Sequence, residues 1–161
     1  MQIRSLTPGD DAALAALIRK NLKAYGLDIP GTAYYDEALD RLSAYYAHPG
    51  RAYFVLAENE KPVGGIGLAE ISLFPRCCEM QKLYLDDAVK GHGLGYRLIE
   101  TAEQAARRLG YGRMYLETHT RLQAAIHLYE KCGYREIPRP SGAVHSAMNK
   151  FYLKVLLPEE A

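Results

Sequence analysis

A glycine-rich turn between a strand and a helix constrains the fold more than any other feature of this chain. The turn, Lys90-Gly91-His92-Gly93-Leu94-Gly95, follows the apolar segment Cys77–Leu85, which predicts a buried strand. Apolar residues then recur at helical spacing from Leu94 to Leu109. Such a strand–turn–helix unit points unpaired backbone N–H groups and the positive end of a helix dipole at one spot. That spot binds phosphate, and glycine lets the backbone approach the anion closely.

The spacing of the glycines excludes two common phosphate-binding loops. A dinucleotide fingerprint needs a third glycine where this chain has Tyr96, one position later than its own third glycine. A nucleotide-triphosphate loop ends in Gly-Lys-Ser or Gly-Lys-Thr, whereas this turn ends in Gly95-Tyr96-Arg97. The phosphate ligand must therefore belong to another class.

The turn matches the pattern [Gln/Arg]-x-x-Gly-x-[Gly/Ala] at every position except the first, and two further segments follow it at fitting distances. A predicted strand covers Arg113–Thr118, and Ala125-Ile126-His127-Leu128-Tyr129-Glu130-Lys131-Cys132-Gly133-Tyr134 matches A-[IV]-x-L-Y-[EK]-x-x-G-[FY]. Together these motifs resemble the Gcn5-related N-acetyltransferases (GNAT family) over about Cys77–Tyr134. Lys90 stands where the family usually has Gln or Arg. The backbone donors are unaffected, so we expect a change of affinity rather than of identity.

The resemblance implies one α/β N-acetyltransferase domain over residues 1–161, with a coenzyme A-binding core at about 77–134. The implied fold has a mixed, mostly antiparallel central sheet with a splayed parallel strand pair, flanked by about four helices. Local patterns predict strands at 2–6, 52–57, 63–71 and 113–118, a helix at 35–46 and a short helix at 122–132. A last strand at 150–156 is expected to close the sheet, after an irregular stretch beyond Tyr134. Gly64, Gly65 and Gly67 indicate close backbone approach within the 63–71 strand.

The resemblance also implies that acetyl coenzyme A is the cosubstrate and says which residues bind it. The diphosphate would be held by the turn that Lys90 opens, mainly through the N–H groups of residues 91 to 96, which are Gly91, His92, Gly93, Leu94, Gly95 and Tyr96. The pantetheine arm would pair with a strand edge at Leu83, Tyr84 and Leu85. The N–H of Leu83 would face the thioester carbonyl and stabilise the developing oxyanion.

Acetyl transfer to an amine also needs a proton acceptor and a proton donor. An alkylamine with a pKa of about 10.4 is almost fully protonated at neutral pH, so the site must remove a proton. Glu79 is the candidate base, because alternation places Glu79, Gln81 and Leu83 on one face before any bulge. The resemblance aligns Tyr129 with a tyrosine that faces the coenzyme sulfur, which makes it the candidate general acid. The alternatives are an ion-pair role for Glu79 and a core position for Tyr129.

The acceptor pocket is expected from the segments that are least like the family, Tyr25–Tyr35 and Arg139–Asn149. Carboxylates there could attract an ammonium group, and nearby arginines could hold a carboxylate. His145 could line this pocket, while the side chain of His92 is expected to point to solvent. The candidate charged residues are Asp28, Asp36, Glu37, Arg76, Arg121 and Arg139. Both signs occur, which fits an amino acid or a small amine and selects neither.

Composition excludes several other classes of partner. A net charge of +1, with scattered basic residues, argues against nucleic-acid binding. No apolar run approaches the roughly 20 residues of a membrane span, and the N-terminus lacks a signal-peptide pattern. Three cysteines without metal-ligand spacing predict no metal site and indicate free thiols in a cytoplasmic protein. The fold suggests a homodimer through edge strands or the last hairpin.

These observations predict an acyltransferase (EC 2.3.1.-) that transfers an acetyl group from acetyl coenzyme A to a primary amine of a small molecule. Transfer is expected by direct attack in a ternary complex. Two alternatives stay open: a catalytically inert module that binds acyl coenzyme A or an amino acid, and an O-acetyltransferase. The joint presence of Glu79 and Tyr129 favours the enzyme, because an inert module would not need both.

Overall fold

The chain folds around one twisted sheet of seven strands, in the order β1-β2-β3-β4-β5-β7-β6. The structure is a computed structural model and describes residues 1–158. The only parallel neighbours in the described sheet are β4 and β5; the other pairs are antiparallel. The predicted mixed sheet with one parallel pair is thus confirmed. The strands are β1 (Gln2–Ser5), β2 (Ala52–Glu58), β3 (Lys61–Ile71), β4 (Cys77–Leu85), β5 (Arg113–Thr118), β6 (Arg135–Ile137) and β7 (Lys150–Val155).

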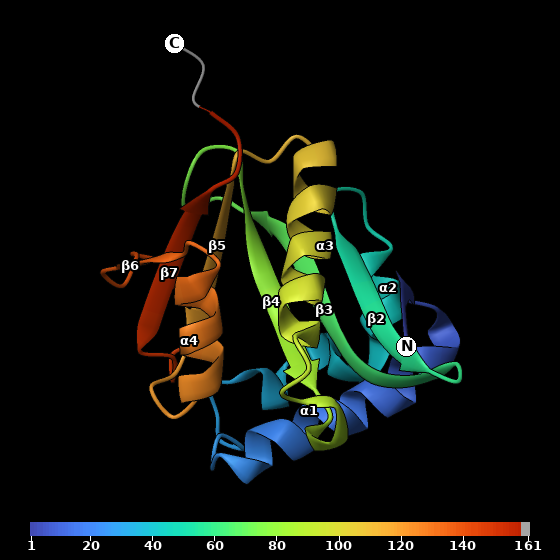
Figure 1. Ribbon diagram of the computed structural model, residues 1–161. Helices are drawn as coiled ribbons and strands as arrows, with labels where there is room; N and C mark the ends of the chain where they lie inside the picture. Colours follow the sequence, from blue (N-terminus) through green and yellow to red (C-terminus); the bar gives the residue numbers. More distant parts are fainter. Residues whose placement is uncertain (159–161) are drawn as a thin grey trace.

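Helices cover both faces of the sheet (Figure 1). On one face α3 (Leu94–Arg108) and α4 (Gln123–Lys131) pack against the strands, and α1 (Asp11–Ala24) and α2 (Leu42–Tyr46) lie on the other. Each face therefore has its own apolar core. The α3 core includes Leu98, Ile99 and Ala102, which the helical spacing of the sequence places on one stripe.

Glycines in β3 allow the α2 face of the sheet to be covered by tyrosines. A Cβ atom on Gly67 would lie 2.6 Å from the hydroxyl oxygen of Tyr46, and one on Gly65 would lie 2.4 Å from the Tyr53 ring. Real side chains do not approach so closely, so both positions require glycine. The predicted close approach in this strand is confirmed, and its partners are the rings of Tyr46 and Tyr53.

Two expectations for the chain trace were wrong. The predicted helix over 35–46 is two 3₁₀ turns, Ala33–Tyr35 and Glu37–Arg41, followed by the short α2. Asp36 separates the turns because its backbone is extended, with ψ of 130°. The second error concerns the edge of the sheet: β6 lies outside β7, although it falls in the stretch beyond Tyr134 that was expected to be irregular. A three-residue strand is too short to show a period of two in sequence.

Candidate active site

The parallel strands β4 and β5 diverge at their C-terminal ends. Their pairing runs from Cys77 and Arg113 to Glu79 and Tyr115, and within the described residues it stops there, although β4 continues to Leu85. The opening holds a cavity of about 390 Å³, lined by both strands, the start of α3, α4 and the 139–149 segment. Figure 1 shows the two strands diverging beside α3 and α4.

A β-bulge in β4 determines which side chains face the cavity from each side. The register between β3 and β4 shifts where Lys82 adopts a left-handed backbone with φ of 51°. The hydroxyl of Tyr53 donates to the Lys82 carbonyl at 3.0 Å. Leu83 then packs with the α3 core, whereas Gln81 contacts the α2 face. The strand alternation that would place Glu79, Gln81 and Leu83 on one face is therefore broken at this bulge, and the Leu83 side chain lies on the α3 side of the sheet.

The predicted phosphate-binding turn leads directly into α3. Gly91 and Gly93 have φ of 81° and 73°, values that favour glycine, and a Cβ atom at either would meet no atom within 4 Å. These glycines are therefore not explained by packing; they leave the turn open. In the described chain, none of the six backbone N–H groups from Gly91 to Tyr96 has a hydrogen-bond acceptor. Gly95 differs, because a Cβ there would lie 2.7 Å from the Leu128 side chain of α4.

Most of the predicted coenzyme-binding residues line this one cavity. It is lined by Leu83, Tyr84, Leu85, Lys90, Gly91, Gly93, Leu94, Gly95 and Tyr96. His92 is exposed and outside the lining, so its side chain takes no part in shaping the cavity. Lys90 forms an ion pair with Asp87 at 2.8 Å and donates to the Asn21 side chain of α1 at 3.3 Å. These contacts fasten the turn to α1, beside the positive end of α3.

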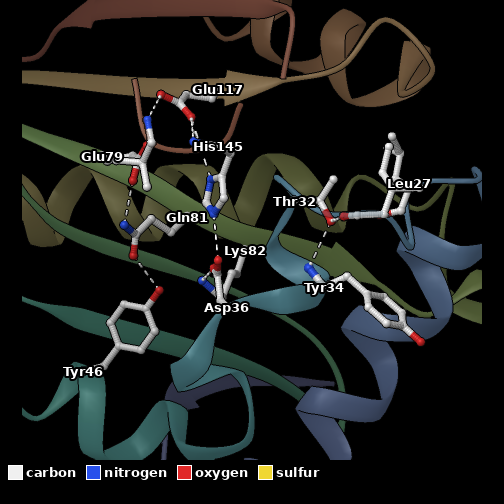
Figure 2. A network of polar contacts seen from close by, with 12 residues as sticks. Leu27, Thr32, Tyr34, Asp36, Tyr46, Glu79, Gln81, Lys82, Glu117 and His145 are labelled. Atoms are coloured by element: carbon white, nitrogen blue, oxygen red, sulfur yellow. Dashed lines mark hydrogen bonds and ion pairs between the residues drawn. The ribbon is translucent and has the colours of Figure 1, made fainter. Parts of the chain in front are cut away.

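Glu79 lies at the floor of the cavity with little hydrogen bonding to its carboxylate. It is 5% exposed, and its only hydrogen-bond donor among the described residues is the Gln81 amide, at 2.6 Å. The Tyr46 hydroxyl in turn donates to the Gln81 carbonyl oxygen at 2.8 Å, which fixes the orientation of that amide (Figure 2). Burial raises the pKa of Glu79, and the nearby Glu117 carboxylate adds to the rise, against the Gln81 bond. No ion pair to Glu79 exists in the described chain.

Tyr129 reaches the same cavity from α4. Its ring packs edge-on against Tyr134 and tilted against Tyr152, so the side chain belongs to the α3-side core as well as to the cavity. Its hydroxyl has no hydrogen-bond partner in the described residues, and it is not sealed from the cavity. Burial raises the pKa of Tyr129, so the phenol stays protonated at neutral pH. The two roles that the sequence left open, core residue and cavity hydroxyl, are compatible.

A polar cluster assembled from distant segments closes the far end of the cavity (Figure 2). The His145 imidazole bonds to Asp36 at 2.9 Å, and Asp36 also pairs with Lys82 at 2.8 Å. The Glu117 carboxylate accepts the His145 backbone N–H at 3.1 Å and the Tyr115 hydroxyl at 2.7 Å. The cluster ties the 33–37 and 139–149 segments to β4 and β5. Glu79, Lys82, Glu117 and His145 line the cavity, while Asp36 lies behind them.

A sequence profile of the Acetyltransferase (GNAT) family matches residues 17–134, most of the chain. The chain belongs to this family. YjgM of Escherichia coli (strain K12), an uncharacterised N-acetyltransferase, is 39% identical over 137 residues, which are 84% of this chain and 82% of that protein. The similarity covers both strands that form the cavity.

Solved structures show the same GNAT fold at low sequence identity. An acetyltransferase of this family from Staphylococcus aureus Mu50 aligns over 96% of this chain and 98% of its own, with a TM-score of 0.86 and 20% identity. The protein yncA from Salmonella typhimurium, whose structure contains acetyl-CoA, aligns over 100% and 96% with a TM-score of 0.76 and 22% identity. These structures show that the chain has the GNAT fold, and the family match identifies it as an acyltransferase.

Some polar residues of this GNAT site were missed by sequence reasoning. Lys82 and Glu117 were not singled out, and Gln81 was named only as a residue on the Glu79 face, because a strand position says little about its partner until the fold brings segments together. Asp36 and His145 were suggested for the acceptor region and do meet there. The three suggested arginines lie outside the cavity lining: Arg121 bonds the Gly26 carbonyl, Arg139 stacks on Phe151, and Arg76 lies beside Gly110.

The cysteines of this GNAT chain are free. Cys77 and Cys78 are buried in β4 and Cys132 is half-buried at the end of α4. Burial raises the pKa of Cys77 to about 12, so its thiol is unreactive. Among the helices of residues 1–158, none is long and apolar enough to cross a membrane.

Proposed function

We propose that this GNAT chain transfers an acetyl group from acetyl coenzyme A to a primary amine of a small molecule. One observation carries the proposal. Six consecutive backbone N–H groups have no acceptor among the described residues, and five of them belong to residues that line the same cavity as a buried carboxylate with one amide donor and a tyrosine hydroxyl without a described partner. An anion site, a proton acceptor and a proton donor are what thioester aminolysis requires.

The turn from Lys90 to Tyr96 suits a diphosphate. Its unpaired amides and the α3 dipole supply positive potential without desolvating a side-chain charge, and the open space at Gly91 and Gly93 leaves room for phosphate oxygens. Beyond Glu79, β4 has an edge that β5 does not pair with in the described sheet. This edge can form hydrogen bonds with the amides of the pantetheine arm. The backbone N–H of Leu83 is the proposed donor to the thioester oxygen, where a fixed donor stabilises developing negative charge.

Glu79 is the proposed base. Its raised pKa keeps the carboxylate closer to the neutral range than an exposed glutamate, so it can accept the proton of an incoming ammonium group directly or through water. Gln81, held by Tyr46, leaves the other carboxylate oxygen free for this task. Activity is therefore expected to fall as the pH decreases through the pKa of Glu79, because the protonated carboxyl cannot accept a proton.

Tyr129 is the proposed acid for the leaving thiolate. An ordinary phenol has a pKa of about 10 and a thiol about 8.5, so proton transfer between them is only slightly uphill. The burial that raises the pKa of Tyr129 would act on a thiolate in the same cavity too, because desolvation disfavours any anion. The hydroxyl has no competing partner in the described residues.

The function is tested by thiol release from acetyl coenzyme A in the presence of primary amines, with the acetylated product identified by mass spectrometry. Tyr129→Phe should lower kcat by about 10- to 100-fold while leaving acetyl coenzyme A binding within about twofold. The matched control is Tyr111→Phe, which removes a hydroxyl that donates to Gly50 at 2.7 Å, away from the cavity lining. An amide product supports N-acetylation. An ester product, or coenzyme binding without turnover of any amine, would contradict it.

A further inference from the structure

The charged side chains at the acceptor end of the cavity are almost completely paired with one another. Asp36 pairs with both cations of the cluster, Lys82 at 2.8 Å and His145 at 2.9 Å. Glu117 accepts three bonds, from the backbone N–H groups of Val144 and His145 and from the Tyr115 hydroxyl. Within the described residues, the cations of this cluster are thus already bonded to protein carboxylates.

Glu79 is the exception in this cluster. Within residues 1–158, its carboxylate is bonded only to the neutral amide of Gln81. With Glu79 ionised, the cluster has three carboxylates, Asp36, Glu117 and Glu79, against two cations, Lys82 and His145. The 2.9 Å contact between His145 and the Asp36 carboxylate suits a protonated imidazole, and although burial lowers the pKa of His145, Asp36 and Glu79 raise it overall. The sum is one negative charge, which a single positive charge in the cavity would balance.

The rest of this end of the cavity has apolar surface. Ala33, Leu122 and Tyr84 pack with the α2-side core and also line the cavity, and Met148 is 7% exposed beside β5. A substrate carboxylate here would meet cations that Asp36 already holds and would lie near the Glu117 carboxylate. A second substrate ammonium would be desolvated without a counter-charge. Both situations are costly in a buried site.

We propose that the acceptor is an apolar monoamine: a molecule with one ammonium group, which meets Glu79, and an uncharged, largely apolar body. This rests on the N-acetyl transfer proposed above and names its substrate class. The charged residues considered one by one would allow amino acids and polyamines as acceptors. The ion pairs that these residues form with one another disfavour both. Specificity then comes from charge balance at the buried end of the cavity.

Two matched pairs of amines test this class. Phenethylamine and phenylalanine differ by one carboxylate, and butylamine and 1,4-diaminobutane differ by one ammonium group. Initial rates of thiol release at saturating acetyl coenzyme A give kcat/KM for each, with the diamine corrected for its two amino groups. The monoamine of each pair should be preferred by at least about tenfold. A phenylalanine methyl ester should behave like phenethylamine, since its carboxylate is capped.

Asp36→Asn sharpens the test because it releases Lys82 from its ion pair without changing the size of the side chain. The variant should raise the kcat/KM of phenylalanine relative to phenethylamine by several-fold. Asp40→Asn, which breaks an exposed ion pair with Arg19, is the control and should leave the ratio unchanged. Equal or better use of phenylalanine or of the diamine by the unmodified protein would overturn the proposed class and leave N-acetyl transfer standing. Coenzyme binding with no amine acetylated would overturn both proposals.

Discussion

Two carboxylates of this protein are equally buried and differ in almost everything else. Asp10, between β1 and α1, is 4% exposed, and Glu79, in the cavity, is 5% exposed. Asp10 accepts two bonds from the Arg4 guanidinium at 2.8 Å and two more from the backbone and hydroxyl of Thr7. The Arg4 bonds hold the pKa of Asp10 down to about 2 despite its burial. Glu79 has a single amide donor, and its pKa is raised.

The difference shows that hydrogen-bond donors, together with burial, decide what a carboxylate with little exposed surface can do. Asp10 is saturated with donors, so it is a fixed anion that holds the first strand to the first helix. Burial raises the pKa of Glu79, and with one amide donor among the described residues its second carboxylate oxygen has no bond in this part of the chain. One fold thus contains a carboxylate that stabilises the structure, Asp10, and a carboxylate suited to reaction, Glu79.

The largest expected effect comes from removing the charge of Glu79. Glu79→Gln keeps the shape and should lower kcat by about 100-fold, because the general base is lost. The thermal stability of the folded variant, unlike its kcat, should not decrease. A folded-state pKa raised above the unfolded value contributes stability at low pH that is lost as pH rises through it. The glutamine side chain of the variant does not ionise, so this loss of stability does not occur in it. At pH 8 the variant should therefore unfold at no lower temperature than the parent protein.

Steady-state kinetics and thermal unfolding at pH 8 measure both quantities on the same samples. Unchanged kcat with a clearly lower unfolding temperature would make Glu79 a structural residue like Asp10. The comparison between the two carboxylates would then fail.

The next effect concerns the saturated carboxylate. Asp10→Asn should leave kcat within about twofold and lower the free energy of unfolding at pH 7. A pKa change from 3.8 to about 2 corresponds to at most about 2 kcal/mol, since Arg4 is partly exposed. The depressed pKa stabilises the folded state above pH 3.8 and this contribution is lost as pH falls toward 2. Urea unfolding across this range should show the variant and the parent converging at low pH; a constant difference would contradict the assignment.

A smaller effect is expected from the cation beside Glu79. His145 lowers the pKa of Glu79 through its charge, while burial raises it. His145→Gln should therefore move the acidic limb of the kcat/KM profile to higher pH, and activity well above that limb should change little. His48→Gln is the control, because the His48 ring lies outside the cavity lining and its only hydrogen bond among the described residues is with the Pro49 carbonyl. A uniform loss of activity at every pH would instead indicate that His145 only holds the 139–149 segment in place.

Local sequence patterns were enough to predict the parts of the site that lie on one continuous segment. The bounds of β4, Cys77–Leu85, and of β5, Arg113–Thr118, were predicted correctly, and so was the start of α3 at Leu94. Strand alternation, helical spacing and glycine turn chemistry are all local signals. Gly91 and Gly93 could be interpreted because their backbone conformation depends on their immediate neighbours.

The acceptor end could not be predicted in the same way. His145 and Asp36 are 109 positions apart, and only the complete fold brings them within 2.9 Å. The bulge at Lys82 is also hidden, because a lysine with positive φ leaves no mark in sequence; its support comes from the Tyr53 hydroxyl of another strand. The charges of the candidate residues in the sequence suggested both a cationic and an anionic ligand. The ion pairs in the fold instead leave one carboxylate without a cationic partner among the described residues.

Calorimetric titration of coenzyme A into matched glycine variants tests most directly whether the turn before α3 binds a diphosphate. Gly93→Asp places a carboxylate in the turn, and Gly110→Asp is the control, since Gly110 also has positive φ, at 90°, and equally open space. Gly110 follows the far end of the same helix. We expect Gly93→Asp to lose detectable binding while the parent and Gly110→Asp bind alike. Equal affinity of folded Gly93→Asp would contradict the account.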